Sequence, residues 1–310
     1  MKKLFGNKSE KTNRVIQKIT SVKFVTSFAV VILAVACGLW QYHNVTSQDR
    51  IFWGMIDNSL QTSSFSKTST IQSGGQSALQ VTDVFTSPKQ EVYSRTHYSQ
   101  SGADEADATT ENIGTPYRDY VRYTEINTTQ KNTQGKPFDF SNIVNIWGAS
   151  PDQGKKDTTG QLFNQSVLGV LPTGNLTAAQ RKQLIKLMKD NKAYSYKMHK
   201  TSSQFLLSRP SYSFTVTVSP PAYITVLKQF AKDIGLNQLE SIDPQEYKDS
   251  AEMQFEVTVD GWSHQVIEVT QTASNKKESI SAQNVRKQLP TPPTKSIDIE
   301  DLQTRLQSVE

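Results

Sequence analysis

The chain has 310 residues, enough for one large domain or two small ones. Hydrophobic residues make up 35% of it and charged residues 20%, and the formal net charge is only +5. With 13 Phe, 11 Tyr and 4 Trp it has material for a core. Disordered chains combine few aromatic residues with a high net charge, so this composition excludes that class.

The positive charge is concentrated at the N-terminus. Residues 1–23 carry seven basic side chains and a single acid, Glu10, which leaves the rest of the chain close to neutral. A nucleic-acid-binding protein carries its basic surface on the folded domain, so we expect no nucleic-acid partner. The basic residues are Lys2, Lys3, Lys8, Lys11, Arg14, Lys18 and Lys23.

An apolar run from Phe24 to Tyr42 is predicted to be a transmembrane helix. The chain contains no Asp, Glu, Lys or Arg between Lys23 and Asp49. About 20 apolar residues span a bilayer core of about 30 Å. Trp40 and Tyr42 stand at the far end, where aromatic side chains favour the membrane interface.

The basic tail sets the expected orientation, because positively charged flanks remain in the cytoplasm. The sequence therefore predicts a single-pass protein of the cell membrane in three parts: a cytoplasmic tail over 1–23, a signal-anchor over 24–42 and an extracytoplasmic domain over 43–310. The N-terminus is expected in the cytoplasm and the C-terminal domain outside.

Two other interpretations of the apolar run remain open. Ala34-Val35-Ala36 fits a signal-cleavage pattern. The stretch around Cys37 also resembles a bacterial lipobox, in which this cysteine is lipidated, although Leu33 stands one place too early. The apolar run continues to Trp40, which favours an uncleaved anchor. Cys37 is the only cysteine, so the exported domain has no disulfide.

The first half of the exported region is predicted to be strands behind one helix. The helix covers Asp49–Gln61, with Phe52, Met55, Ile56 and Leu60 on one face. A polar, acidic stretch over Gln100–Asn112 is predicted to be an exposed loop. Apolar residues at helical spacing predict a helix over Phe138–Trp147. Strands are predicted over Phe65–Gln72, Leu79–Phe85, Glu91–Tyr98 and Tyr117–Ile126.

The second half alternates helices and strands. Thr177 and Gln180 form a capping-box signature that opens a helix to Asp190. A second helix begins at Pro220 and ends at Gly235. Asp260-Gly261 predicts a hairpin turn. Strands are predicted over Ala193–His199, Tyr212–Val218, Met253–Val259, Trp262–Thr270 and Ser279–Arg286, and a final helix over Ile299–Val309.

Runs of strands interrupted by helices indicate an α+β fold with an antiparallel sheet. The strand Met253–Val259 alternates strictly, so one of its faces must be covered. The predicted helices around Leu184 and Phe230 are the candidates to cover it. If they fit closely they make an ordinary core, and if they stand apart they leave an apolar cavity.

This order of elements, behind a lipoprotein-like N-terminus, resembles the LolA/LppX group of bacterial lipoprotein and lipid carriers. The helix Asp49–Gln61 leading into strands, the meander Met253–Arg286 and the closing Pro290–Pro293 segment carry the resemblance. It implies a curved, half-barrel-like antiparallel sheet with helices on its concave side and an apolar cavity suited to an acyl chain. These folds have no diagnostic motif, so no functional residue is transferred.

The sequence predicts no catalytic, cofactor-binding or metal-binding residue. It contains no HExxH, CxxC, P-loop, GxGxxG or GxSxG motif. The acids of Gly102–Asp107 lack the glycine and the bidentate glutamate of a calcium loop. His97 and His264 lie within predicted strands, where a structural role is expected. We therefore expect no enzyme and no cofactor.

Two functions follow from these expectations. The first is a membrane-anchored extracytoplasmic binding protein with a lipid or lipoprotein ligand. The second is a structural subunit of a secretion or conjugation assembly, similar to VirB8-like subunits, with other envelope proteins as partners. A deep apolar pocket favours carriage, and a filled core favours assembly.

Overall fold

The computed structural model describes residues 30, 32–38, 47–73, 76–87, 91–102, 105–152, 160–200, 210–236, 238–272, 276–282 and 289–309. The chain divides into two compact units, Met1–Arg50 and Ile51–Glu310. The second unit contains the sheet and nearly all of the described elements.

In the first unit, residues 32–38 are helical, and the apolar side chains of Ile32, Leu33 and Val35 are exposed, as is Cys37. No helix in the described part of the chain is long and apolar enough to cross a membrane. The tail 1–23 and most of the predicted span Phe24–Tyr42 lie outside the described residues. The anchor therefore stays a prediction.

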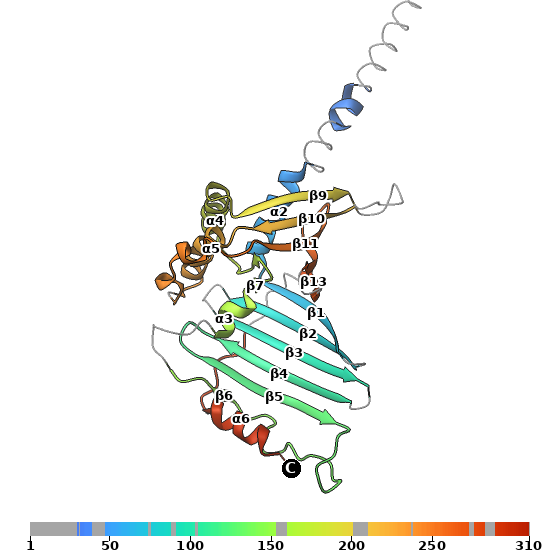
Figure 1. Ribbon diagram of the computed structural model, residues 1–310, viewed down its shortest axis with the longest axis vertical. Helices are drawn as coiled ribbons and strands as arrows, with labels where there is room; N and C mark the ends of the chain where they lie inside the picture. The colour runs from blue at the N-terminus through green and yellow to red at the C-terminus, as the bar shows by residue number, and fades with distance from the viewer. Residues whose placement is uncertain are drawn as a thin grey trace, which may run out of the picture. The chain divides into compact units, whose positions relative to one another are not determined.

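Among the described residues, twelve strands form one curved, unclosed sheet (Figure 1). Neighbouring strands run antiparallel except at one edge, where β14 pairs parallel to β6. The spatial order is β14-β6-β5-β4-β3-β2-β1-β13-β12-β11-β10-β9. The strands are β1 (Ser64–Ser73), β2 (Gln76–Ser87), β3 (Glu91–Ser101), β4 (Ala106–Gly114), β5 (Asp119–Thr128), β6 (Gly148–Ala149), β9 (Tyr194–Lys200), β10 (Ser211–Val218), β11 (Met253–Asp260), β12 (Val266–Gln271), β13 (Lys276–Ala282) and β14 (Ile297–Asp298).

The helices confirm most of the local predictions. Thr177 and Gln180 form the predicted capping box of α4, and Pro220 opens α5. Gly235 follows α5 with φ +84°, a conformation that favours glycine. The helices are α2 (Gln48–Gln61), α3 (Gly160–Gln165), α4 (Ala178–Asp190), α5 (Pro220–Asp233) and α6 (Ile299–Gln307), with 3-10 turns η1 (Gln238–Ser241) and η2 (Pro244–Tyr247). The mixed α+β class and the large sheet are thus confirmed.

The main core lies where α2, α4 and α5 cover one face of β9–β12. The predicted apolar face of α2 is fully buried, and the ring of Phe52 stacks on Tyr196 with centroids 3.8 Å apart. Val257 of β11, Leu184 of α4 and Phe230 of α5 are also fully buried. Each such side chain contributes about 1.5–3 kcal/mol through removal from water.

A short hairpin completes this core. It consists of β7 (Val167–Leu168) and β8 (Leu171–Pro172) and is separate from the main sheet. Val170 and Leu171 are buried in the core cluster, and the Tyr194 hydroxyl donates a hydrogen bond to the Val170 carbonyl oxygen at 2.7 Å. The hairpin therefore occupies space between the helices and the sheet.

The prediction of an exposed loop over Gln100–Asn112 was wrong, because residues 106–112 belong to β4. This strand lies inside the sheet and pairs with β3 and β5 along its length. Its two faces are both rich in polar residues, so it shows no hydrophobic alternation. The backbone ladder on both edges, together with β-branched Thr109 and Thr110, stabilises the strand instead.

The predicted helix Phe138–Trp147 was also wrong. The segment forms a turn at residues 141–145, and Asn145 adopts φ +64°. The Asn145 N–H donates to the Tyr123 carbonyl oxygen of β5 at 2.7 Å. Ile143 is fully buried although the segment is not helical. Its asparagines and β-branched residues are weak helix formers, so tertiary contacts determine the backbone.

The hairpin predicted at Asp260-Gly261 exists, but its loop is longer than two residues. The Asp260 carboxylate accepts hydrogen bonds from the N–H groups of Trp262 and Ser263 at 3.1 and 2.7 Å. His264 adopts φ +54°, and β12 begins only at Val266. Trp262 therefore belongs to the loop, with 69% of its surface exposed, and not to the returning strand.

Candidate functional site

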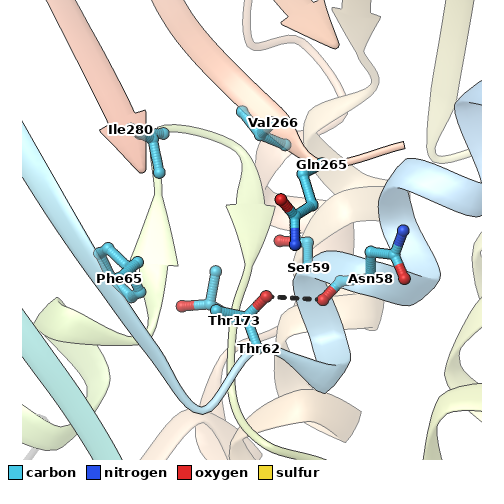
Figure 2. Close-up of a pocket in the computed structure, with 8 residues that line it drawn as sticks. All are labelled: Asn58, Ser59, Thr62, Phe65, Thr173, Gln265, Val266 and Ile280. Carbon is cyan, nitrogen blue, oxygen red and sulfur yellow. Dashed lines mark hydrogen bonds between the residues drawn. The ribbon is translucent and has the colours of Figure 1, made fainter. Parts of the chain in front are cut away.

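In the described part of the chain, the core beneath the helices contains a small cavity. It lies beside the C-terminal end of α2 and has a volume of about 20 Å³ (Figure 2). That is room for about one water molecule. The Thr173 hydroxyl is buried there without a protein partner, which makes it a suitable ligand for such a water. The lining residues are Asn58, Ser59, Thr62, Phe65, Thr173, Gln265, Val266 and Ile280.

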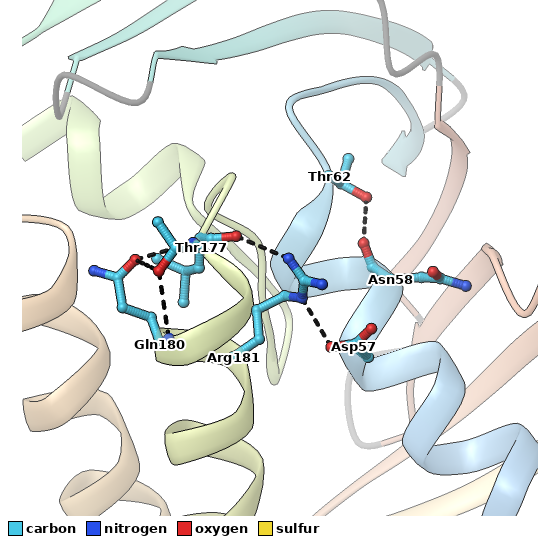
Figure 3. Close-up of polar contacts among 7 residues, drawn as sticks. Asp57, Asn58, Thr62, Thr177, Gln180 and Arg181 are labelled. Atoms are coloured by element: carbon cyan, nitrogen blue, oxygen red, sulfur yellow. Dashed lines mark hydrogen bonds and ion pairs between the residues drawn. The ribbon is translucent and has the colours of Figure 1, made fainter.

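Polar contacts fasten α2 around this cavity. The Arg181 guanidinium of α4 donates to the Asp57 carboxylate at 2.8 Å and to the Leu176 carbonyl oxygen at 3.0 Å (Figure 3). The Ser59 hydroxyl donates to the Pro172 carbonyl oxygen at 3.0 Å. The helix is thus tied to both α4 and the β7–β8 hairpin, and an acyl chain has no space in this cavity.

The face of the sheet that carries the helices continues across β1–β5. The register places Phe65, a core residue, beside Val84. Val84 in turn lies in a row with Ser94, Asn112 and Val121. The next row contains Thr82, Thr96, Thr110 and Tyr123, and the row after it contains Gln80, Tyr98, Ala108 and Ile126. On β2–β5 these three rows carry no charged residue.

A larger cleft opens on this face between β4, β5, α3 and α6. We call it the β5 cleft, and its volume is about 250 Å³. Leu302 of α6 lies against Gly148, where an added Cβ would come within 2.8 Å of the leucine side chain. The lining residues are Asn112, Asp119, Tyr120, Val121, Tyr123, Ser150, Gln161, Ile299, Leu302 and Gln303.

Asp119 builds one wall of the cleft. The Gln161 N–H at the start of α3 donates to both of its carboxylate oxygens, at 3.1 and 3.0 Å. The Asp119 N–H donates to the Ser150 hydroxyl at 3.0 Å. Burial raises the pKa of the Asp119 carboxyl, and the Gln161 N–H opposes that rise. A Cβ on Gly160 would collide with this carboxylate, so the approach requires glycine.

The lining combines uncharged polar groups with apolar ones. Asn112, Gln161 and Gln303 provide amides, while Val121, Ile299 and Leu302 provide apolar surface. None of the ten described lining residues is a lysine or an arginine. Arg118 lies at the border, where its Nε donates to the Ser150 carbonyl oxygen at 2.7 Å and its guanidinium lies 5.5 Å from the Tyr120 ring centroid.

The histidines singled out by sequence lie elsewhere. His97 on β3 contacts the Thr109 hydroxyl at 3.2 Å and the Asp107 carboxylate at 3.4 Å. The His264 ring lies against Gly54 of α2. In the described part of the chain, no group of three or more His, Cys, Asp or Glu residues is placed to hold a metal ion.

Sequence reasoning missed the β5 cleft. Its walls come from β4, predicted to be a loop, and from α3, a six-residue helix with no apolar stripe. Asn112 and Gln303 lie far apart in the chain, and no local pattern links them. Two predicted elements do reach the cleft: the strand Tyr117–Ile126 carries Val121 and Tyr123 into it, and the final helix Ile299–Val309 carries Leu302 and Gln303.

Comparison with known proteins adds little to this geometry. No family model and no curated protein matches the chain. Among solved structures, a beta-barrel-like protein of domain of unknown function DUF1849 from Brucella abortus is loosely similar. It has 7% sequence identity and a TM-score of 0.26, with 71% of this chain and 95% of that chain covered. A likeness at this level supports no argument, and the LolA/LppX resemblance stays unconfirmed.

Proposed function

We propose that this chain is a membrane-anchored extracytoplasmic binding protein whose ligand occupies the β5 cleft. The proposal rests on the difference in volume and lining between two cavities on one face of the sheet. The space beside α2 holds about 20 Å³, whereas the cleft holds about 250 Å³ and mixes apolar side chains with hydrogen-bonding ones. Such a mixture is typical of ligand sites. The protein acts in this proposal by binding and not by catalysis.

The anchor in this proposal rests on the N-terminal sequence. The basic tail 1–23 precedes an uncharged run, and the exposed Ile32, Leu33 and Val35 present apolar surface suited to lipid contact. Only residues 43–47 separate the predicted span from α2. At about 3.5 Å per residue, this segment reaches at most roughly 18 Å, so the domain would stay close to the membrane surface.

The family resemblance implied a lipid or lipoprotein ligand. The cavity beside α2 is too small for an acyl chain. The cleft itself is smaller than the roughly 300–1,000 Å³ of typical small-molecule pockets. A lipid or lipoprotein would therefore present only a polar or terminal group to the cleft, with its acyl chains held elsewhere.

Native mass spectrometry of the full chain, extracted from its own membrane, tests the proposal. Gln303 is exposed on α6 and lines the cleft, so Gln303→Trp should fill it. Gln307→Trp is the matched control on the same helix. We expect a bound mass in the wild type and in Gln307→Trp and its loss in Gln303→Trp. A bound mass in all three would place the ligand outside the cleft, and none in any would count against a binding function.

A structural role in an envelope assembly is the second candidate. The filled core around Phe52 and Leu171 and the unclosed sheet, which ends at β9 and β14, favour it. Crosslinking of the full chain in its own membrane distinguishes the two. Stable crosslinked partners that persist in Gln303→Trp, together with the absence of a bound small molecule, would favour assembly.

A further inference from the structure

The electrostatics of the β5 cleft disfavour a charged ligand. Among its described lining residues Asp119 is the acid, and both of its oxygens already accept a hydrogen bond from the Gln161 N–H. The guanidinium of Arg118 is engaged with Ser150 and Tyr120 at the border. An ionic ligand would lose its hydration without gaining a dedicated partner, which is costly. A neutral ligand avoids this loss.

The hydrogen-bonding groups of the cleft are mainly amides. Asn112, Gln161 and Gln303 each carry both donors and an acceptor. The Asn112 amide donates to the Ser94 hydroxyl at 3.4 Å, and the Gln161 side-chain oxygen accepts from the Gln165 amide at 3.3 Å. The remaining amide atoms, with the exposed Gln303, can pair with hydroxyl or amide groups in either sense. The half-buried side chains of Val121 and Tyr123 provide apolar surface beside them, whereas Leu302 is buried. A ligand that presents hydroxyl groups around its edge and C–H groups on its face uses both kinds of surface. Saccharide rings have this construction.

Uncharged polar and aromatic side chains also line the sheet surface beyond the cleft. Tyr123 of the cleft shares a row with Thr110, Thr96 and Thr82, where the last two hydroxyl groups lie 3.1 Å apart. In the next row, the Tyr98 hydroxyl donates to Gln100 at 2.8 Å. Thr82 on β2 is buried, with 2% of its surface exposed, so the accessible part of these rows runs from β5 to β3. Neighbouring strands are about 4.8 Å apart, so it extends roughly 10 Å. This uncharged strip has room for more than one ring.

A peptide ligand fits these rows less well. Extended peptides gain much of their affinity by pairing with a free strand edge. Strands β3 and β4 lie inside the sheet, and both edges of each are paired with neighbours. The strip also lacks charged anchors for a charged peptide. It therefore favours a ligand recognised by side chains alone.

We infer that the β5 cleft and the strip of Thr96, Tyr98 and Thr110 beside it bind a neutral saccharide chain. The inference rests on the proposed binding function and names its ligand class. One ring occupies the cleft between Tyr123, Val121 and the amides of Asn112 and Gln303. Further rings lie over β4 and β3.

The test uses the full chain in lipid nanodiscs, since sugar-based detergents would compete. Calorimetric titration with two neutral probes, cellotetraose and the tetrasaccharide of N-acetylglucosamine, should give saturable binding of at least one. Gln303→Ala should weaken it about threefold to tenfold, the effect of one lost hydrogen bond. Gln307→Ala is the matched control and should leave it unchanged. Tyr98→Ala should weaken the tetrasaccharide but not the matching monosaccharide.

Several outcomes would overturn the inference. Lack of binding by both saccharides, or equal effects of Gln303→Ala and Gln307→Ala, would reject a saccharide in the cleft. If the natural bound mass still disappears in Gln303→Trp, the binding function stands and only the ligand class is wrong. If a neutral tetrapeptide binds with the same dependence on Gln303, a peptide replaces the saccharide. If no probe binds and no natural mass is found, both proposals fail.

Discussion

The β7–β8 hairpin is predicted to be a packed part of the core, and Leu171→Ala tests this. Leu171 is fully buried in the cluster that α2, α4 and α5 form with the sheet. Truncating a leucine in such a site costs about 2–5 kcal/mol, because transfer energy is lost and a cavity remains. The matched control is Leu79→Ala on β2, where the side chain is 42% exposed and the expected cost is below about 0.5 kcal/mol.

The assay is urea unfolding of the full chain, followed by circular dichroism, together with a thermal scan. For a domain of this size, 1 kcal/mol shifts the melting temperature by about 2–4 °C. A loss of about 3 kcal/mol therefore lowers it by about 6–12 °C in Leu171→Ala, while Leu79→Ala stays near the wild type.

The result that refutes the reasoning is a cost below about 1 kcal/mol for Leu171→Ala, similar to that of the exposed control. Such a result would mean that the hairpin lies loosely over the sheet and that the space beneath it is available. If a fluorescent fatty acid then bound the wild-type chain saturably, an acyl-chain carrier would become the favoured function.

Four further predictions concern other parts of the molecule. Arg181→Met should cost about 1–3 kcal/mol in urea unfolding, because Asp57 and the Leu176 carbonyl oxygen lose their donor. Asp119→Asn should remove one contribution to the pH dependence of the free energy of unfolding. Because burial raises the pKa of Asp119, the wild type has extra stability below pH 3.8, and it loses this stability as the pH rises through the folded-state pKa. Cys37→Ala should stay in the membrane, and protease added to protoplasts should digest a C-terminal tag.

Each of these has an outcome that would contradict it, and Arg181→Met also has a control. Lys182→Met removes an exposed charge beside Arg181 and should cost less than about 0.5 kcal/mol. If both variants cost the same, the ion pair between Arg181 and Asp57 does not stabilise the fold. A stability difference between Asp119→Asn and the wild type that is the same at pH 3 and pH 7 would contradict the burial of Asp119. Release of Cys37→Ala from the membrane would establish the lipoprotein interpretation, and a protected tag would reverse the topology.

The elements that sequence predicted correctly are those with strong local signals. The face of α2 repeats at helical spacing, Thr177 and Gln180 cap α4 with their own side chains, and β11 alternates because helices cover one face only. β4 was missed because its stability comes from backbone pairing with β3 and β5, which no periodicity reveals. The apolar spacing over Phe138–Trp147 gave a wrong helix for the opposite reason: Ile143 is buried, but burial of an apolar residue does not require a helix.

One sheet face thus behaves differently in its two halves, and the side chains explain why. Over β9–β12 the inward residues are large and apolar, such as Phe214 and Phe255, and three helices and the β7–β8 hairpin must cover them. Over β2–β5 the inward residues include Thr96 and Thr110, which tolerate water and need no cover. The binding that we propose therefore belongs to the half that the three helices do not cover, where α3 and α6 leave the β5 cleft beside Tyr123.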